Sequence, residues 1–411
     1  MTMYYNKVRQ RLGFGLSREL WLVQVGIFLN TFGWGAVLPF EIIYLHDGRG
    51  FSLSVAGLVV GTLTGVAVVS APLAGSLIDR FGARTTAAGA GLALAAGYAG
   101  LAFAETEAVA FAAATLAGAG NGALGPAQST LLAALAPPEL RHRATAVSRV
   151  STNVGFGLGG AVGGVVAATG LTGLVTLFLV NALSYVVYIG VLVAVVREAP
   201  ATEHIRGGYR LVLRDRAFVH LALTNVAIIG VGWGVLPWLV PPYAKSEAGI
   251  DAELIGLLML ANAATVVVAQ VPIARAAEGR RRVVMIALGS AIFAASCVLI
   301  VVAGITPSHA YPALLAAAVA IGVGECFHSA ALMPLVAELA PPGLRGRYMA
   351  TIGLSWWIGL AVAPTAGAQL LSLTPAAAFL TAAAVAVAAA GSALALEREL
   401  PLQVRVTPQP G

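Results

Sequence analysis

The chain has 411 residues, of which 59% are apolar and only 10% are charged, and its net charge is +6. A soluble protein carries nearer a quarter charged residues because its surface faces water. The composition therefore excludes a soluble globular protein and places most of the surface in lipid.

Apolar segments of spanning length recur along the whole chain. Each reaches the roughly 20 helical residues that a ~30 Å hydrocarbon layer requires, and continuous Leu, Ala and Val favour helices over barrel strands. In chain order the predicted spans are 20–45, 52–78, 84–104, 108–135, 144–169, 172–196, 217–244, 252–274, 283–304, 310–337, 345–371 and 375–396. We therefore predict an all-α integral membrane protein with twelve transmembrane helices.

The basic residues predict the orientation of these spans. With the N-terminus in the cytoplasm, 22 of the 24 Lys and Arg residues face inward, since only Arg49 and Lys245 fall on the outer side. We therefore expect both termini in the cytoplasm and the protein in the cell's inner, or plasma, membrane. The same asymmetry explains the positive charge without a nucleic-acid partner.

An internal repeat divides the chain. Segment 118–143 recurs at 322–347 with an offset of 204 residues, and 33–39 parallels 232–237. A six-plus-six repeat is an architecture used for alternating access. We therefore predict two pseudo-symmetric six-helix bundles at 1–196 and 217–396, a cytoplasmic linker at 197–216 and a cytoplasmic tail at 397–411.

The loop between the second and third spans, 75–84, reads GSLIDRFGAR. Gly75 lets two helices approach closely, Gly82 permits a tight turn, and Asp79 is an acid on a basic face, where it needs a partner. The loop closely resembles motif A of the major facilitator superfamily, although Ala83 replaces a basic residue. With the spans and the repeat, this resemblance covers nearly the whole chain.

The resemblance implies a cytoplasmic gate. Asp79 would meet the N-terminus of the eleventh helix, whose dipole favours an anion, and nearby arginines would close the cytoplasmic side while the cavity opens outward. The alternative is a solvated turn whose charges only set the topology, which is our interpretation of the degraded copy at 275–282. The gate residues are Gly75, Asp79, Arg80, Gly82, Arg84, Arg141, Arg143, Arg345 and Arg347.

Glycines in the fifth span form a close-packing face. Segment 155–164 resembles the end of motif C of the drug-proton antiporter branch, with Gly160 in place of its proline, and this resemblance favours an antiporter. Ala114 stands where motif B has an intramembrane Arg, so the coupling role of that Arg cannot be transferred. The packing residues are Gly155, Gly159, Gly160, Gly163, Gly164 and Pro364.

Ionisable side chains inside a span are costly and are therefore candidates for function. Glu325 lies in the middle of the tenth span, and His328 follows one turn later on the same face. We predict that Glu325 is the principal proton site and that His328 modulates it. The alternative is a structural hydrogen bond from the tenth helix to the eighth or eleventh. Glu41, near the outer end of the first span, can recognise a cation, carry a proton or reach the interface by snorkelling.

Polar and aromatic residues within the spans are candidates for the substrate cavity. In the resembled superfamily, helices 1, 4, 7 and 10 line it, and a cavity of aromatic and amide groups suits amphipathic organic molecules. The candidates are Asn30, Trp34, Asn121, Gln128, Asn225, Trp233, Asn262, Trp356 and Trp357.

These features predict a secondary transporter that exports small amphipathic compounds in exchange for protons. A symporter that imports a nutrient is the alternative, and a lipid-handling or non-transporting membrane protein is a third possibility. The sequence has no GxxxxGK[ST] loop, which argues against an ATP-driven pump, and its six histidines are scattered, which argues against an enzyme. We expect a monomer without cofactor or metal, and the partners are the substrate, protons and the bilayer.

Overall fold

A computed structural model describes residues 16–137, 140–196, 209–341 and 344–406. Within these ranges the chain is almost entirely helical, and its one isolated β-bridge joins Arg281 to Val406. Eleven of the described helices are long and apolar enough to cross a membrane. The predicted all-α membrane protein is therefore confirmed, whereas the count of twelve spans stays a prediction.

The first group of helices runs to Val195. It consists of α1 (Arg18–Val37), η3 (Leu38–Phe40), α2 (Glu41–Ile43), η4 (Tyr44–Gly48), α3 (Leu53–Phe81), α4 (Ala83–Ala102), α5 (Glu107–Leu135), α6 (Arg141–Ala167) and α7 (Leu171–Val195). The elements α1 to η4 form one continuous span that changes helix type at Pro39, because proline cannot donate the backbone hydrogen bond that a regular α-helix requires.

The second group repeats this order. It consists of α8 (Tyr209–Val212), α9 (Arg216–Gly232), η6 (Val235–Leu239), α10 (Val240–Ser246), α11 (Ala252–Ala276), α12 (Arg282–Ile305), η7 (Pro307–His309), α13 (Ala310–Leu339), α14 (Arg345–Leu373), α15 (Pro375–Leu396) and η8 (Leu402–Val404). Every predicted span matches a helix or a run of helices to within three residues at each end. Part of the predicted linker, 197–208, and the last residues of the predicted tail, 407–411, lie outside the described ranges.

Of the helices that match a predicted span, α4 does not reach the hydropathy of a spanning helix, because it consists mostly of alanine and glycine. It nevertheless packs along α5 and α7. A Cβ on Gly97 would collide with Ala117 of α5, and one on Gly91 would press against Ile189 of α7. The small residues that lower the apolar character of α4 thus allow close contact with its neighbours.

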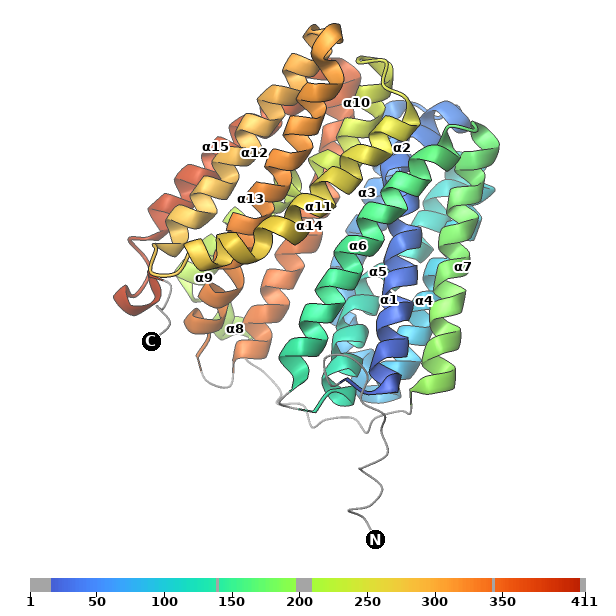
Figure 1. Cartoon of the computed structure of the whole chain (residues 1–411). Helices are drawn as coiled ribbons and strands as arrows, with labels where there is room; N and C mark the ends of the chain where they lie inside the picture. Colours follow the sequence, from blue (N-terminus) through green and yellow to red (C-terminus); the bar gives the residue numbers. More distant parts are fainter. Residues whose placement is uncertain (1–15, 138–139, 197–208, 342–343, 407–411) are drawn as a thin grey trace.

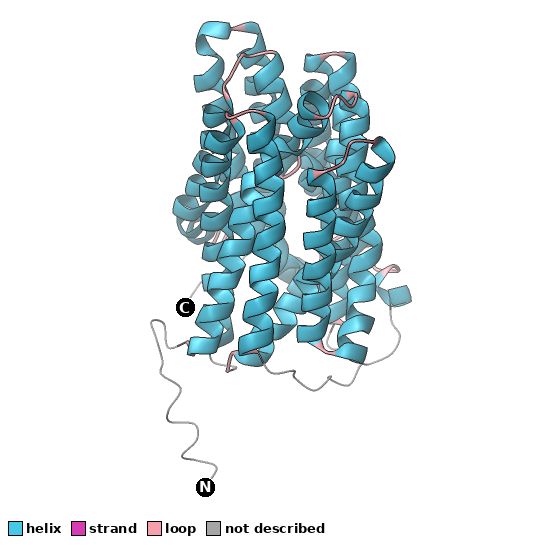
Figure 2. Ribbon diagram, turned by 90° about the vertical axis from the view of Figure 1, so that its right-hand side faces the viewer, coloured by secondary structure: helices cyan, strands magenta, loops and turns pink. Residues whose placement is uncertain are grey.

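The two groups of helices stand side by side and lean on each other (Figure 1). They meet near the end that carries α2 and α10 and diverge toward the opposite end, where α1 begins. The view turned by 90° shows the helices running roughly along one axis, with short loops at both ends (Figure 2). We refer below to the end with α2 and α10 as the upper end and to the end where α1 begins as the lower end.

Glycines on two faces of α6 carry much of the contact between helices. On one face, a Cβ on Gly155, Gly159 or Gly163 would collide with the backbone of α1. On the other face, Gly160 and Gly164 press against α11 of the second group. One helix therefore packs both within its own group and across the two groups.

The corresponding helix of the second group, α14, makes the corresponding contacts. Gly359 and Gly367, which lie 204 residues after Gly155 and Gly163, pack against α9 and Leu239. Across the two groups, the carbonyl of Pro364 and the side chain of Ala368 occupy the space beside Gly57 of α3. The pairs α6–α11 and α3–α14 thus join the two groups in equivalent ways.

Candidate functional site

A buried carboxylate joins the two groups near the upper end. The side chain of Glu41 is only 2% exposed. Its Oε1 accepts a hydrogen bond of 3.0 Å from the hydroxyl of Tyr98, and its Oε2 accepts one of 3.0 Å from the indole Nε1 of Trp238. Tyr98 belongs to the same group as Glu41, whereas Trp238 belongs to the other. Snorkelling to the interface, one of the options for Glu41, is therefore wrong.

Three more polar contacts cross the two groups at this end. Lys245 donates to Asp47 Oδ2 at 2.6 Å. Gln369 Nε2 donates to the carbonyl oxygen of Ser54 at 3.0 Å, and the hydroxyl oxygens of Ser54 and Ser372 lie 3.2 Å apart. Together with the bond between Glu41 and Trp238, these contacts close the upper end.

The motif-like loop between α3 and α4 lies at the lower end. Gly82 has φ = 84°, so the predicted tight turn is confirmed. Around a Cβ on Gly75, however, no other described heavy atom would lie within 4 Å. The close helix approach predicted at Gly75 is therefore not found in this conformation, because α3 and α14 touch nearer the upper end, around Gly57 and Gly61.

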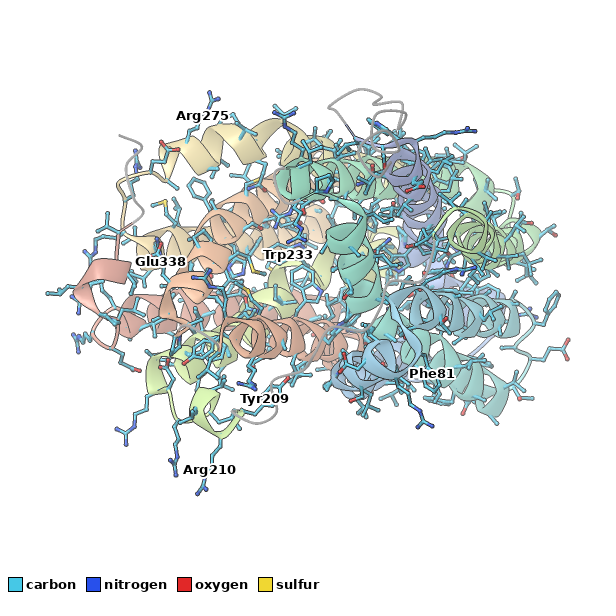
Figure 3. All side chains as sticks on the ribbon, turned by 90° about the horizontal axis from the view of Figure 1, so that it is seen from below. Phe81, Tyr209, Arg210, Trp233, Arg275 and Glu338 are labelled. Atoms are coloured by element: carbon cyan, nitrogen blue, oxygen red, sulfur yellow. The ribbon has the colours of Figure 1, made fainter. Side chains whose placement is uncertain are left out.

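The basic residues assigned to the gate also lie at the lower end. Arg141 and Arg345 are the first residues of α6 and α14, with Arg143 and Arg347 two residues further on. Arg84 Nη2 donates to the carbonyl of Val193 at 2.9 Å, which ties α4 to α7 within the first group. Arg80 lies over the ring of Phe81, which Figure 3 shows near the edge of the molecule. These two contacts do not cross between the groups.

Glu325 lies at the middle of α13, where Asn262 of α11 donates from Nδ2 to its Oε1 at 3.2 Å. No described Lys, Arg or His forms an ion pair with this carboxylate. The hydrogen bond is the structural alternative foreseen from the sequence, with α11 as the eighth span. It does not prevent protonation, because an amide N–H can donate to a carboxylate and, more weakly, to the carbonyl oxygen of a neutral carboxyl group.

His328 does not form the expected pair with Glu325. Its side chain is 2% exposed, and its two ring nitrogens have no hydrogen-bond partner among the described residues. The ring packs instead against Trp233, at 5.3 Å between centroids. A separation of three residues brings two side chains to nearly the same face, but here they contact different neighbours.

Trp233 centres an aromatic cluster of the second group and lies near the middle of the molecule in the view from below (Figure 3). Its ring lies 5.1 Å from that of Trp356 and 5.8 Å from that of Phe293. On the first group, Trp34 packs against Phe156 at 5.5 Å. These rings give the centre of the molecule flat apolar surfaces.

The remaining cavity candidates are spread over both groups. Asn225 is buried and donates to Ser355 at 2.7 Å, and Asn30 is buried with an Nδ2 that has no partner among the described residues. Asn121 and Trp357 are half-buried. Of the nine candidates, Gln128 lines a cavity in the first group of helices.

This cavity, of about 520 Å³, lies between α1, α5 and α6. Arg141 and Arg149 line it beside hydroxyl-bearing residues. Arg149 is not among the site residues predicted from the sequence, where it counts only as one of the basic residues that set the orientation of the spans. An arginine inside the predicted span 144–169 was the signal that could have found it.

Segment 275–282, the degraded copy of the loop between α3 and α4, makes contacts that the sequence did not indicate. Arg282 is fully buried and pairs with Glu338 Oε1 of α13 at 2.5 Å, and Arg281 pairs with Glu397 beyond α15. Arg282 N donates to the carbonyl of Arg405 at 2.9 Å, which fixes the segment after α15. The loop thus ties α12, α13 and the end of the described chain together within the second group. The interpretation that its charges only set the membrane topology is therefore incomplete.

Comparisons with known proteins agree with this architecture. The family model of the Major Facilitator Superfamily matches residues 24–239 and 221–411. The uncharacterized MFS-type transporter YttB of Bacillus subtilis (strain 168) is 28% identical over 87% of this chain and 89% of its own. The multidrug resistance protein MdtH of Aeromonas hydrophila is 26% identical over 80% of this chain and 81% of its own.

Among solved structures, a POT family transporter in complex with 5-aminolevulinic acid superposes with a TM-score of 0.81. The superposition covers 96% of this chain and 99% of the other at 14% sequence identity. At that identity the likeness describes the fold alone.

Proposed function

Because this chain belongs to the Major Facilitator Superfamily, we propose that it is a secondary active transporter that exports small amphipathic organic compounds in exchange for protons by alternating access. The likeness to MdtH supports export, and the likeness to POT transporters concerns only the fold. A symporter with the same architecture is the second candidate, and the two differ in the direction of proton flow.

The unequal closure of the two ends is the observation that carries alternating access. At the upper end, Glu41 with Trp238 and Asp47 with Lys245 bridge the groups. Toward the lower end the groups diverge, and Gly75 makes no close contact. A rocking motion about the contacts of α6 with α11 and of α3 with α14 would break the upper bridges. It would also bring Asp79 toward the N-terminus of α14 and its arginines.

We place the lower end in the cytoplasm of the cell that carries the protein in its inner membrane, because its basic residues follow the positive-inside rule. With α4 as the third of twelve spans, both termini then lie inside. In this orientation the two groups diverge on the cytoplasmic side, the side from which an exporter takes its substrate. One copy contains both groups, so we propose a monomer.

Glu325 is our proposed proton site. It is an acid at mid-helix with an amide donor and no basic partner among the described residues. An isolated carboxylate at membrane depth is stabilised when it binds a proton or a cation. The hydrogen bond from Asn262 is compatible with both protonation states, so the proton can be exchanged without loss of the contact between α11 and α13.

Proteoliposomes that contain the purified chain and an internal pH dye test this function. An outward-directed substrate gradient should drive proton movement in the opposite direction, and Glu325→Gln should remove proton movement while leaving the melting temperature close to that of the wild type. Glu107→Gln, at an exposed residue of the upper end, is the matched control. Protons that move with the substrate would indicate a symporter, and undiminished coupling in Glu325→Gln would exclude Glu325 as the proton site.

A further inference from the structure

A polar stripe runs along α6 on the face that borders the cavity. Arg141, Thr145, Arg149 and Thr152 recur at intervals of three or four residues, which places them on one face, and all four line the cavity. Polar side chains at membrane depth face a water-filled space rather than lipid. The guanidinium-bearing residue Arg149 therefore borders an aqueous cavity about 12 Å along the helix from Arg141.

The charges in this cavity have one sign. Among the described residues that line it, two are arginines and none is Asp or Glu. Arg149 forms no hydrogen bond or ion pair with any described side chain or backbone group through its guanidinium. Arg141 and Arg149 are both exposed, so water reaches their guanidinium groups. A guanidinium group there attracts an anion and can bind two of its oxygens at once.

The other walls suit the remainder of an organic molecule. Ile27 of α1 and Leu132 of α5 contribute apolar surface, and Ser129 and Gln128 add neutral polar groups. A volume of about 520 Å³ is in the range of sites for small organic ligands. The cavity is therefore both basic and partly apolar.

We propose that this cavity binds the carboxylate, sulfonate or phosphate group of an amphipathic substrate, with Arg149 and Arg141 as its partners. The inference rests on the transport function proposed above and narrows its substrate class to organic anions. The headgroup of an anionic lipid presents the same chemistry, so the test has to separate a transported substrate from a bound lipid.

Calorimetric titration of the purified full chain with three naphthalene probes tests the charge preference. We expect 2-naphthoate to bind at least about tenfold more tightly than 2-naphthylmethylammonium or 2-naphthylmethanol, since charge-assisted hydrogen bonds stabilise only the anion. Arg149→Gln should weaken naphthoate binding about tenfold, and Arg149→Lys should weaken it less. Arg275→Gln, at the edge of the molecule (Figure 3), is the matched control and should change nothing. Equal binding of anion and cation, or an unchanged Kd in a folded Arg149→Gln protein, would overturn the proposal.

Transport separates the two sources of the anion. Uptake of labelled naphthoate into proteoliposomes that is lost in Arg149→Gln supports a substrate site. Displacement of naphthoate by dihexanoylphosphatidylglycerol without any naphthoate transport would instead assign the site to a lipid headgroup and overturn the proposal. If naphthoate is transported without protons, the proposed proton coupling is wrong and the proposed anion site is supported. If Arg149→Gln still transports the cationic probe together with a proton flux, the proposed anion site is wrong and the proposed transport function is supported.

Discussion

Replacement of Trp238 by phenylalanine tests whether the buried bond to Glu41 holds the upper end closed. The substitution removes the indole N–H and leaves Oε2 of Glu41 without its donor in a site where the residue is 2% exposed. A buried polar group that loses its partner costs about 1–3 kcal/mol. Donor and acceptor belong to different groups of helices, so this cost falls on the closed upper end. The ratio of closed to open molecules should fall by about 5-fold to about 150-fold.

Tyr98→Phe is the matched control, because Tyr98 donates to the same carboxylate from within the same group of helices. Loss of the Tyr98 hydroxyl group should lower the melting temperature and leave the ratio of closed to open molecules nearly unchanged. Spin labels on cysteines that replace the exposed Glu107 and Glu247 would report the distance across the upper end. The two native cysteines, Cys297 and Cys326, are buried and should label slowly. A distance distribution that is unchanged in Trp238→Phe, or shifted equally by both substitutions, would refute the reasoning.

Three further predictions concern other contacts. Cysteines in place of Ser54 and Ser372, whose hydroxyl oxygens lie 3.2 Å apart, should form a disulfide on mild oxidation and stop transport until it is reduced; full transport by the cross-linked protein would contradict alternating access. Gly164→Val should slow transport severely, as measured by substrate flux, because its side chain would collide with Ala252 and Glu253 of α11, whereas Gly125→Ala, which meets open space, should not. Arg282→Met should lower the melting temperature, because the fully buried guanidinium group no longer ties α12 to Glu338 of α13; an unchanged melting temperature would show that the pair contributes nothing.

Local features were accessible from the sequence because they depend on neighbouring residues. The spans follow from continuous apolar runs, and the turn at Gly82 follows from one glycine between a basic segment and the next span. The packing faces of α6 follow from glycines that repeat every four residues along one helix. In each case the relevant pattern lies within about 30 residues.

Contacts between distant residues were not accessible in the same way. Glu41 and Trp238 are separated by 197 residues, and nothing near Glu41 indicates which side chain of the second half will reach it. The expected pairing of Glu325 with His328 failed because helical spacing fixes the direction of a side chain and says nothing about its nearest neighbour. Arg149 was overlooked because the same positive charge serves both topology and a cavity wall.

The bare glycine surface of α6 has a mechanical consequence. Gly160 and Gly164 lie about one helical turn apart, and both lie close to Gly256 of α11. At these two positions α6 presents no side chain, and the side chain of Met259 of α11 packs against Gly160. A helix surface without side chains can shift along its neighbour while few side chains change rotamer. We expect the motion between the two groups to meet little friction here, so the polar contacts of the upper end, rather than the helix packing, should set how fast the transporter changes state.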